Sequence, residues 1–434
     1  MPFPLARAIS VGTLLLLAAQ AASPSAGAAQ AVARAQTTGV VVPPRDSLIV
    51  SLLTMGQGAM VFDRFGHSAI RIQNLRTGLD SAWNWGMFDF SSPALIPRFV
   101  AGRTQYWMAG YPTPFFVDYY RRQRRAVWEQ ELAFSPAAAD SLLRLLRWNA
   151  LEQNKFYRYD YYLDNCSTRV RDALDAVMGG SLRAALEGPG GGRTWRGETL
   201  RLGEAFPLIS FGMTYTLGAR ADSQITRWQE GFIPMHLRDA LRSVQVAGPT
   251  GQVPLVRGER QLVAETTFVE ASAVPDFSRP AGLIGIVAGW VIVLLGRGAA
   301  RRAWAGHSVA ILGSVWHFAA GFAGVLVLLA GVLDRHHYMG ANTNVLLGTP
   351  VSLILAWLYG RSWRGSSPMR TRLAARNLSL FTAGAALLAA AAHAVPGLAP
   401  ADASPIYFAL PIHLAFAMAL VKRDRIPAPL PSAA

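Results

Sequence analysis

The sequence predicts an exported α+β domain followed by an α-helical membrane domain of about five helices. Three observations lead to this fold class: a secretory signal at the start, strand-like and helix-like segments up to about residue 275, and long apolar segments after residue 280. A chain of 434 residues is long enough for two domains. With 52% hydrophobic and only 15% charged residues, it is too apolar to be wholly soluble.

Residues 1–35 have the pattern of a secretory signal peptide. Arg7 makes the start basic, and an apolar run follows at residues 9–22. We therefore expect residues 36–245 to form an exported domain and residues 246–280 to be a linker. Small-residue cleavage options stand at Ala26-Gly27-Ala28 and Ala33-Arg34-Ala35.

Five apolar segments in the last third of the chain predict membrane helices. Most are shorter than the roughly 20 residues that an upright span needs, so we expect their ends to extend into the flanks. Arg and Lys gather in alternate connections, 297–302 and 361–376, and in the tail 422–434, which assigns these to the cytoplasmic face. The connections 334–344 and 396–405 then lie outside. The five segments are residues 281–296, 307–333, 345–360, 378–394 and 406–421.

The net charge of +15 does not indicate nucleic-acid binding. Much of the excess lies in the predicted cytoplasmic connections, and no basic module with interleaved aromatic residues is present. In the exported domain we expect Arg121, Arg122, Arg124 and Arg125 to form a solvated or headgroup-facing surface.

The first half of the exported domain has the alternation of β-strands. A short buried strand is expected at 48–53, and the next, at 65–73, places His67, Ala69 and Arg71 on one face. A turn at 74–79 leads into an antiparallel strand, 81–88, that carries Asn84 near its middle. Further strands are expected at 102–109 and 125–132.

Helices and loops follow these strands. Ser135 should cap a helix over 136–152, and a further short helix is expected at 235–243. The Gly-Pro-Gly-Gly-Gly run at 188–192 predicts a flexible loop, and 245–275 should be strand and linker.

The only cysteine, Cys166, stands at the predicted start of a helix. Asn165 is a natural N-cap, Gly179 is a natural stop, and Val170 continues an apolar stripe one turn after Cys166. A helix N-terminus favours a thiolate and would stabilise an oxyanion. A lone cysteine can also be a small core residue. An exported chain with a single cysteine forms no internal disulfide, however, which favours a reactive nucleophile.

A thiol nucleophile needs a base, and the base needs an orienting partner. His67 is the leading base, since His236 is the only other histidine of the exported domain. Asn84 on the neighbouring strand is a plausible orienting residue, with Asp164, Asp160 and Tyr159 as alternatives. The adjacent His336 and His337 lack a third ligand, so we expect no metal and no cofactor.

A histidine on an early strand followed by an Asn-Cys pair at a helix start is the order of circularly permuted papain-like folds (NlpC/P60-like or LRAT-like). Four stretches, 51–58, 65–72, 83–90 and 161–172, together resemble the Lnb-type lipoprotein N-acyltransferase family, in which a periplasmic cysteine domain is fused to C-terminal membrane helices. The resemblance extends to 222–237 and to the outer loop 336–344.

The resemblance implies a multi-pass protein of the bacterial inner membrane that transfers a fatty acyl group from a phospholipid to the N-terminal amine of a lipoprotein. Cys166 and His67 would be its catalytic pair, and an acyl-thioester on Cys166 its intermediate. Two alternatives stay open: a periplasmic cysteine peptidase or hydrolase acting on cell-wall peptide or lipid, and a non-catalytic membrane binding protein. We expect substrate contacts from Tyr159, Asn165, His336, Asn342 and Asn344.

Overall fold

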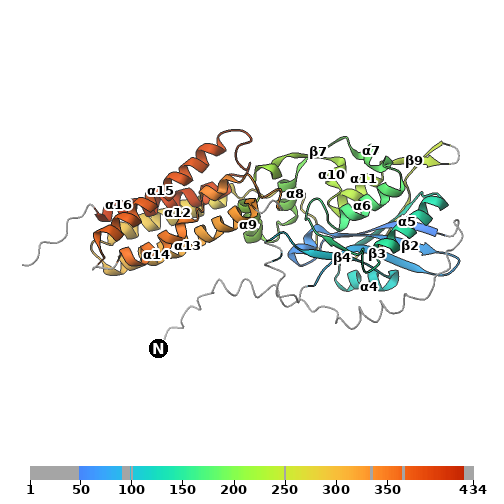
Figure 1. The fold of residues 1–434 in the computed structure, drawn as a ribbon, viewed down its shortest axis with the longest axis horizontal. Coiled ribbons are helices and arrows are strands. Elements are labelled where there is room, and N and C mark those ends of the chain that lie inside the picture. Colours follow the sequence, from blue (N-terminus) through green and yellow to red (C-terminus); the bar gives the residue numbers. More distant parts are fainter. Residues whose placement is uncertain are drawn as a thin grey trace, which may run out of the picture.

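The computed structural model describes residues 48–89, 98, 101–248, 251–332, 336–363 and 367–424. The predicted signal peptide, 1–35, lies outside the described residues, as does most of the predicted cytoplasmic tail. The chain has two parts, a soluble α+β domain and a bundle of long helices, with helix α9 (Pro207–Thr216) between them (Figure 1).

A seven-stranded antiparallel sheet forms the centre of the soluble domain, in the order β11-β5-β1-β2-β3-β4-β6. The five strands predicted from the alternation are present. The edge strand β11 pairs with β5, so part of the range expected as linker belongs to the sheet. The strands are β1 (Leu48–Met55), β2 (His67–Asn74), β3 (Asp80–Met87), β4 (Gln105–Pro112), β5 (Val127–Leu132), β6 (Phe156–Arg158) and β11 (Val256–Val263).

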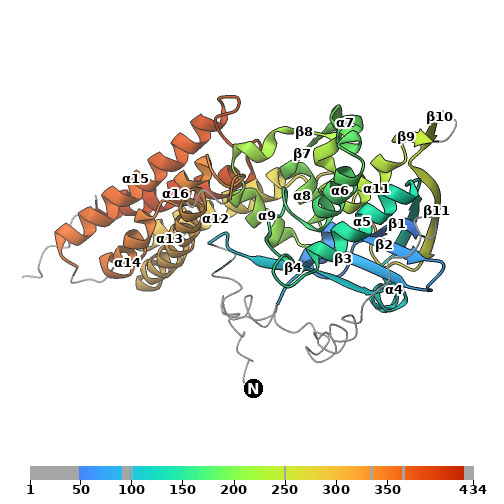
Figure 2. The same ribbon diagram turned by 45° about the vertical axis from the view of Figure 1, so that its right-hand side comes forward.

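Helices cover both faces of this sheet (Figure 2). One face packs on α5 (Pro136–Asn149), α6 (Cys166–Val177) and α11 (Pro234–Leu241), through strand residues such as Ile70 and Trp83. The other face packs on α4 (Thr113–Arg122), through residues such as Ala69 and Ala82. Because neighbouring strand residues point to opposite faces, β2 and β3 each contribute to both cores.

The smaller elements complete the soluble domain. The helical ones are η3 (Val61–Phe65), α7 (Ser181–Leu186), α8 (Trp195–Leu202), η4 (Ala219–Asp222) and α10 (Arg227–Glu230). Two-stranded pairs are formed by β7 (Pro189–Thr194) with β8 (Gln224–Thr226) and by β9 (Gln245–Gly248) with β10 (Gly251–Pro254).

The prediction of a flexible loop at 188–192 is wrong, because strand β7 begins at Pro189. Gly190 lies so close to β8 that an added Cβ would be 2.2 Å from the carbonyl oxygen of Ile225. The amide of Gly191 donates to the Glu230 carboxylate at 2.7 Å. The glycines therefore permit close backbone approach within a strand pair, and the run is ordered by hydrogen bonds.

Among the described residues, five helical segments are long and apolar enough to cross a membrane, as predicted. Several extend beyond the apolar cores read from the sequence, and large apolar side chains such as Leu283, Trp290 and Phe318 lie exposed on them, as lipid contact requires. The segments are α12 (Ser278–Gly298), α13 (Ala303–Val332), η5 (Thr343–Leu346) with α14 (Val351–Ser362), α15 (Met369–His393) and α16 (Ser404–Asp424).

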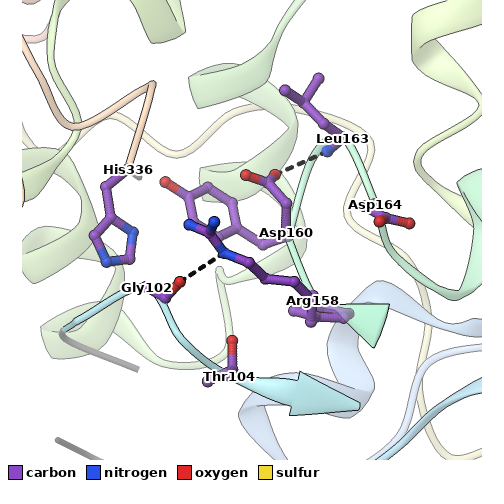
Figure 3. A pocket seen from close by; sticks show the side chains of 9 residues that line it. Gly102, Thr104, Arg158, Asp160, Leu163, Asp164 and His336 are labelled. Atoms are coloured by element: carbon purple, nitrogen blue, oxygen red, sulfur yellow. Dashed lines mark hydrogen bonds between the residues drawn. The ribbon is translucent and has the colours of Figure 1, made fainter. Parts of the chain in front are cut away.

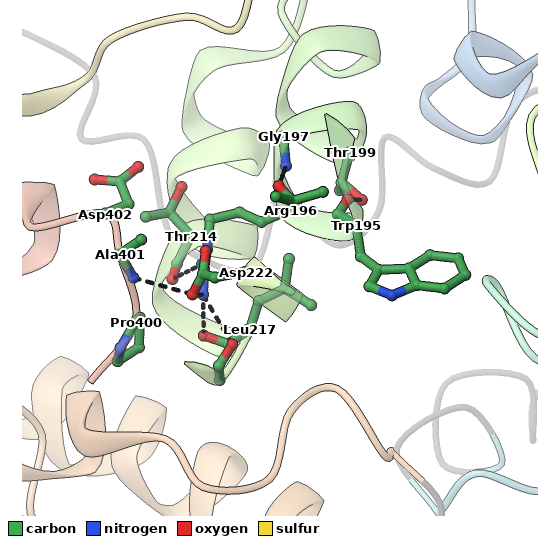
Figure 4. A network of polar contacts seen from close by, with 12 residues as sticks. Trp195, Arg196, Gly197, Thr199, Thr214, Leu217, Asp222, Pro400, Ala401 and Asp402 are labelled. Carbon is green, nitrogen blue, oxygen red and sulfur yellow. Dashed lines mark hydrogen bonds and ion pairs between the residues drawn. The ribbon is translucent and has the colours of Figure 1, made fainter. Parts of the chain in front are cut away.

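The C-terminal end of α9 joins the two parts. A helix end leaves carbonyl groups without intrahelical partners. From the soluble domain, buried Arg196 donates to the carbonyls of Thr214, Leu217 and Gly218 and pairs with Asp222 at 2.6 Å (Figure 4). Asp222 in turn accepts the amide of Ala401, from the connection between α15 and α16, at 3.0 Å.

The outer loop before α14 bonds to the same helix end. Asn342 donates to the carbonyls of Tyr215 and Thr216, and Asn344 to those of Thr214 and Tyr215. Tyr338 of this loop is buried among aromatic side chains of the soluble domain. The two parts are thus held by hydrogen bonds and by shared core packing.

We expect Arg196→Met to destabilise the soluble domain by about 3–5 kcal/mol, because it leaves a largely buried carboxylate without its partner. The measurement is guanidinium unfolding of the full chain in detergent, followed by tryptophan fluorescence. The exposed Arg183, paired with Glu187 on the surface, provides the matched control, since Arg183→Met should change little. Equal stability of both variants would show that the joint does not depend on this ion pair.

Candidate active site

Cys166 is the first residue of α6 and is half-buried. Asn165 caps the helix: its side-chain oxygen accepts the amides of Ser167 and Thr168 at 2.8 and 2.9 Å, and the Thr168 hydroxyl accepts the Asn165 amide at 2.8 Å. This capping box fixes the turn that carries the thiol. The capping box uses the amides of Asn165 and Ser167 but not the amide of Cys166 between them.

The site forms at a bulge in β3. The pairing of β3 with β4 shifts between Asn84 and Met87, and Gly86 adopts a φ of +98°, which side-chain-bearing residues rarely adopt. A Cβ built on Gly86 would be 3.4 Å from the Cys166 Cβ and 3.7 Å from the His67 Cε1. Cys166 and His67 therefore flank the same backbone position.

The bulge brings together side chains from opposite faces of the sheet. His67 precedes Ala69 by two residues in the strand, so both side chains point to the face that α4 covers. The centroid of the His67 ring lies 6.2 Å from that of Tyr120 in α4. Cys166 belongs to α6, whose apolar stripe packs on the other face. Both lie beside Gly86, where β3 leaves its regular ladder.

Asn84 bonds directly to His67, with 3.1 Å between its side-chain oxygen and the ring Nε2. Its amide nitrogen donates to the carbonyl of Ala109 at 3.1 Å, which fixes the amide orientation. An amide oxygen only accepts, so Nε2 carries the proton and Nδ1 is the basic nitrogen.

The alternative orienting residues are engaged elsewhere. Asp160 accepts the amides of Tyr162 and Leu163, and Asp164 pairs with Arg169. Tyr159 stacks on Tyr106, with ring centroids 4.2 Å apart.

Burial decides the resting charges of the pair. It raises the pKa of the Cys166 thiol to about 11, although backbone amides of Ser68, Ser167 and Cys166 near the sulfur lower it. It also lowers the pKa of His67 to about 4, against a smaller opposing effect of the Asn84 hydrogen bond. The expected thiolate is therefore not the resting form, because desolvation outweighs the helix N-terminus. Thiol and imidazole are both neutral near pH 7.

Three neighbours of the site were not predicted from the sequence: Gly86, Tyr120 and the environment of Arg125. The expectation of a solvated surface is wrong for Arg125, which is buried. It donates to the Gly56 carbonyl at 3.0 Å and to Asp63 at 2.7 Å. Its guanidinium lies over the Tyr120 ring, 4.9 Å from the centroid. Its positive charge also contributes to the lowered pKa of His67.

Two of the predicted substrate residues line one pocket of about 320 Å³ (Figure 3). Tyr159 comes from the segment that leads to Cys166, and His336 from the outer loop of the membrane domain. The others lie apart from it: Asn165 caps α6, while Asn342 and Asn344 bond to the end of α9. Substrate contact by these five residues stays a prediction.

Fold and site define a membrane protein whose soluble α+β domain brings a cysteine, a histidine and an asparagine together. Residues 44–197 match the family of the Lnb N-terminal periplasmic domain. This match confirms the predicted Lnb-type resemblance, with a periplasmic domain on a membrane-associated protein. No curated protein and no solved structure matches the chain.

The charge state of the pair can be tested by alkylation. With a thiol pKa near 11, the rate of Cys166 labelling by iodoacetamide should rise about tenfold per pH unit from neutral to moderately alkaline pH. The measurement is the mass of the intact protein over time, with Cys166→Ala as the unlabelled control. A rate that stays level from mildly acidic to neutral pH would reveal a thiolate–imidazolium pair instead.

Proposed function

We propose that this protein is a membrane-bound cysteine acyltransferase of the bacterial inner membrane. It moves a fatty acyl group from a phospholipid to the N-terminal amine of a lipoprotein, through an acyl-thioester on Cys166. The observation that supports this best is the His67–Asn84 hydrogen bond beside a capped helix that begins at Cys166. A histidine on β2 followed by a cysteine at a helix start also supports a permuted papain-like arrangement.

The proposed first step begins from the neutral pair. The Cys166 sulfur attacks the ester carbonyl carbon of the phospholipid, and its proton moves to Nδ1 of His67 as the bond forms. The oxyanion that results lies near the amide of Cys166, which the cap does not use and which donates to it. When the intermediate collapses, the C–O bond breaks and the lysophospholipid oxygen takes the proton back from His67.

In the second step the neutral amine of the lipoprotein attacks the thioester carbonyl. His67 accepts a proton from the amine, the C–S bond breaks, and the released sulfur regains that proton. A covalent intermediate lets two large membrane-held substrates use one base and one oxyanion site in turn. Tyr106, Tyr157 and Tyr159 contact one another and lie near enough to Cys166 for its charge to act on their phenols, so these rings limit the access of water to the thioester.

The intermediate provides the decisive test. Purified protein incubated with phospholipid vesicles should gain the mass of a fatty acyl group, and neutral hydroxylamine should remove it. Cys166→Ala should gain nothing. A peptide adduct with cell-wall fragments would favour the peptidase, and lipid hydrolysis without an adduct would favour another hydrolytic mechanism. An inert Cys166 together with normal cellular function of Cys166→Ser would favour the binding protein.

The roles of base and orienting residue predict a graded loss of activity. His67→Ala should lower acyl transfer by about 10²–10⁴-fold, since no other base replaces it. Asn84→Ala should lower it by about 10–100-fold, because the base remains but loses its orientation. Rates of adduct formation measure both.

Asn154→Ala is a matched control for Asn84, because its amide bonds to the carbonyl of Trp148 in a turn outside the site. Wild-type rates for Asn84→Ala would refute the orienting role, and substantial residual activity of both Cys166→Ala and His67→Ala would refute the catalytic pair.

A further inference from the structure

The pocket of Figure 3 lies where the soluble domain meets the outer loop of the membrane domain. Its walls are formed by the segment that precedes Cys166, by the segment before β4 and by His336. The ring of His336 stacks on that of Tyr161, with centroids 6.4 Å apart. The pocket thus includes a residue of the outer loop, and its wall ends two residues before Cys166.

Both signs of charge are present in this pocket. Among the ion pairs of the described residues, only one charged group of the lining takes part, Asp164 with Arg169. Arg158 and Asp160 line the same pocket without forming an ion pair with each other or with another described side chain. The pocket therefore contains one cationic and one anionic side chain that are available to bind a charged ligand.

Both groups are held in place by the backbone. The Nε of Arg158 donates to the Gly102 carbonyl at 2.8 Å, and one oxygen of Asp160 accepts the amides of Tyr162 and Leu163 at 2.9 and 2.8 Å. The other guanidinium nitrogens and the second carboxylate oxygen remain available to a ligand. Such fixed groups bind a complementary ligand at a low entropic cost.

We propose that this pocket binds the headgroup of a zwitterionic phospholipid, with the phosphate at Arg158 and a primary ammonium at Asp160. This assignment rests on the proposed acyl transfer and names the donor class of that reaction. Guanidinium groups bind phosphate through paired hydrogen bonds. A carboxylate beside the rings of Tyr159 and Tyr161 suits an ammonium group. A lipoprotein amine has the positive charge alone and would leave Arg158 without a partner.

The location agrees with this role. The ester bonds of a phospholipid lie next to its headgroup, so a headgroup held in the pocket presents an ester beside the segment that carries Cys166. The phenol of Tyr159 lines the pocket; burial raises its pKa, and a charge on the nearby Cys166 sulfur raises it further.

The test compares phosphatidylethanolamine vesicles with phosphatidylglycerol vesicles as acyl donors. Wild-type Cys166 should be acylated faster from phosphatidylethanolamine. Asp160→Asn keeps the acceptor for the two amides and removes the charge, so it should lower the phosphatidylethanolamine rate by roughly tenfold or more and spare the phosphatidylglycerol rate. Arg158→Gln should lower both rates. Glu187→Gln, an exposed carboxylate at the end of α7, is the control and should change neither.

Three results would overturn the assignment. The first is equal wild-type rates from both lipids. The second is an equal loss from both lipids in Asp160→Asn, which indicates a structural role. The third is normal acylation of Cys166 with slow transfer to an amine, which indicates that the pocket holds the acceptor.

Lipid binding separates this inference from the proposed function. Native mass spectrometry of Cys166→Ala measures which lipid the protein retains, without any chemistry. Retention of phosphatidylethanolamine over phosphatidylglycerol, lost in Asp160→Asn, supports the pocket even if Cys166 is never acylated in the wild type. Equal retention of the two lipids overturns it whatever the reaction.

Discussion

The site depends on one irregularity of the backbone, the bulge of β3 at Gly86. Without it, the sheet would separate the helix that carries Cys166 from the face that carries His67 and Asn84, because residues of opposite faces do not meet across a regular strand. The positive φ of Gly86, which residues with a side chain rarely adopt, permits the bulge that lies beside both Cys166 and His67. The hydrogen bond that His67 donates to Asn84 fixes the histidine, and the cap by Asn165 fixes the helix start that carries Cys166.

Local rules were sufficient to predict the elements that carry these residues. The capping residue and apolar stripe placed Cys166 at a helix start, and the alternation of the two strands placed His67 and Asn84 near each other. The meeting of Cys166 with His67 was expected only from their chemistry, since no local pattern encodes an approach through a bulge. In the sequence, nothing distinguishes Gly86 from other glycines within predicted strands.

Long-range contacts account for the incorrect predictions. Arg125 belongs to a basic run that is typical of an exposed surface. Its guanidinium is nevertheless buried, because it donates hydrogen bonds to the Gly56 carbonyl and the Asp63 carboxylate, which lie far away in the sequence. The glycines of β7 are indistinguishable from a flexible linker until β8 pairs with them. The expected thiolate followed from the helix start alone. The burial that opposes it arises from tertiary packing, which a single helix cannot predict.

The joint at the end of α9 has a consequence for how substrates reach the site. Hydrogen bonds from Arg196, Asn342 and Asn344 converge on one helix end, and Tyr338 is buried in the soluble domain, so this domain cannot swing freely away from its membrane helices. Under the proposed function, both substrates are lipid-anchored and must arrive by lateral diffusion within the same bilayer leaflet. Collision frequency is then governed by the number of molecules per unit of membrane area. Adding inert lipid to the same membrane would lower the rate of transfer. Diluting the vesicle suspension with buffer would leave the rate per vesicle unchanged.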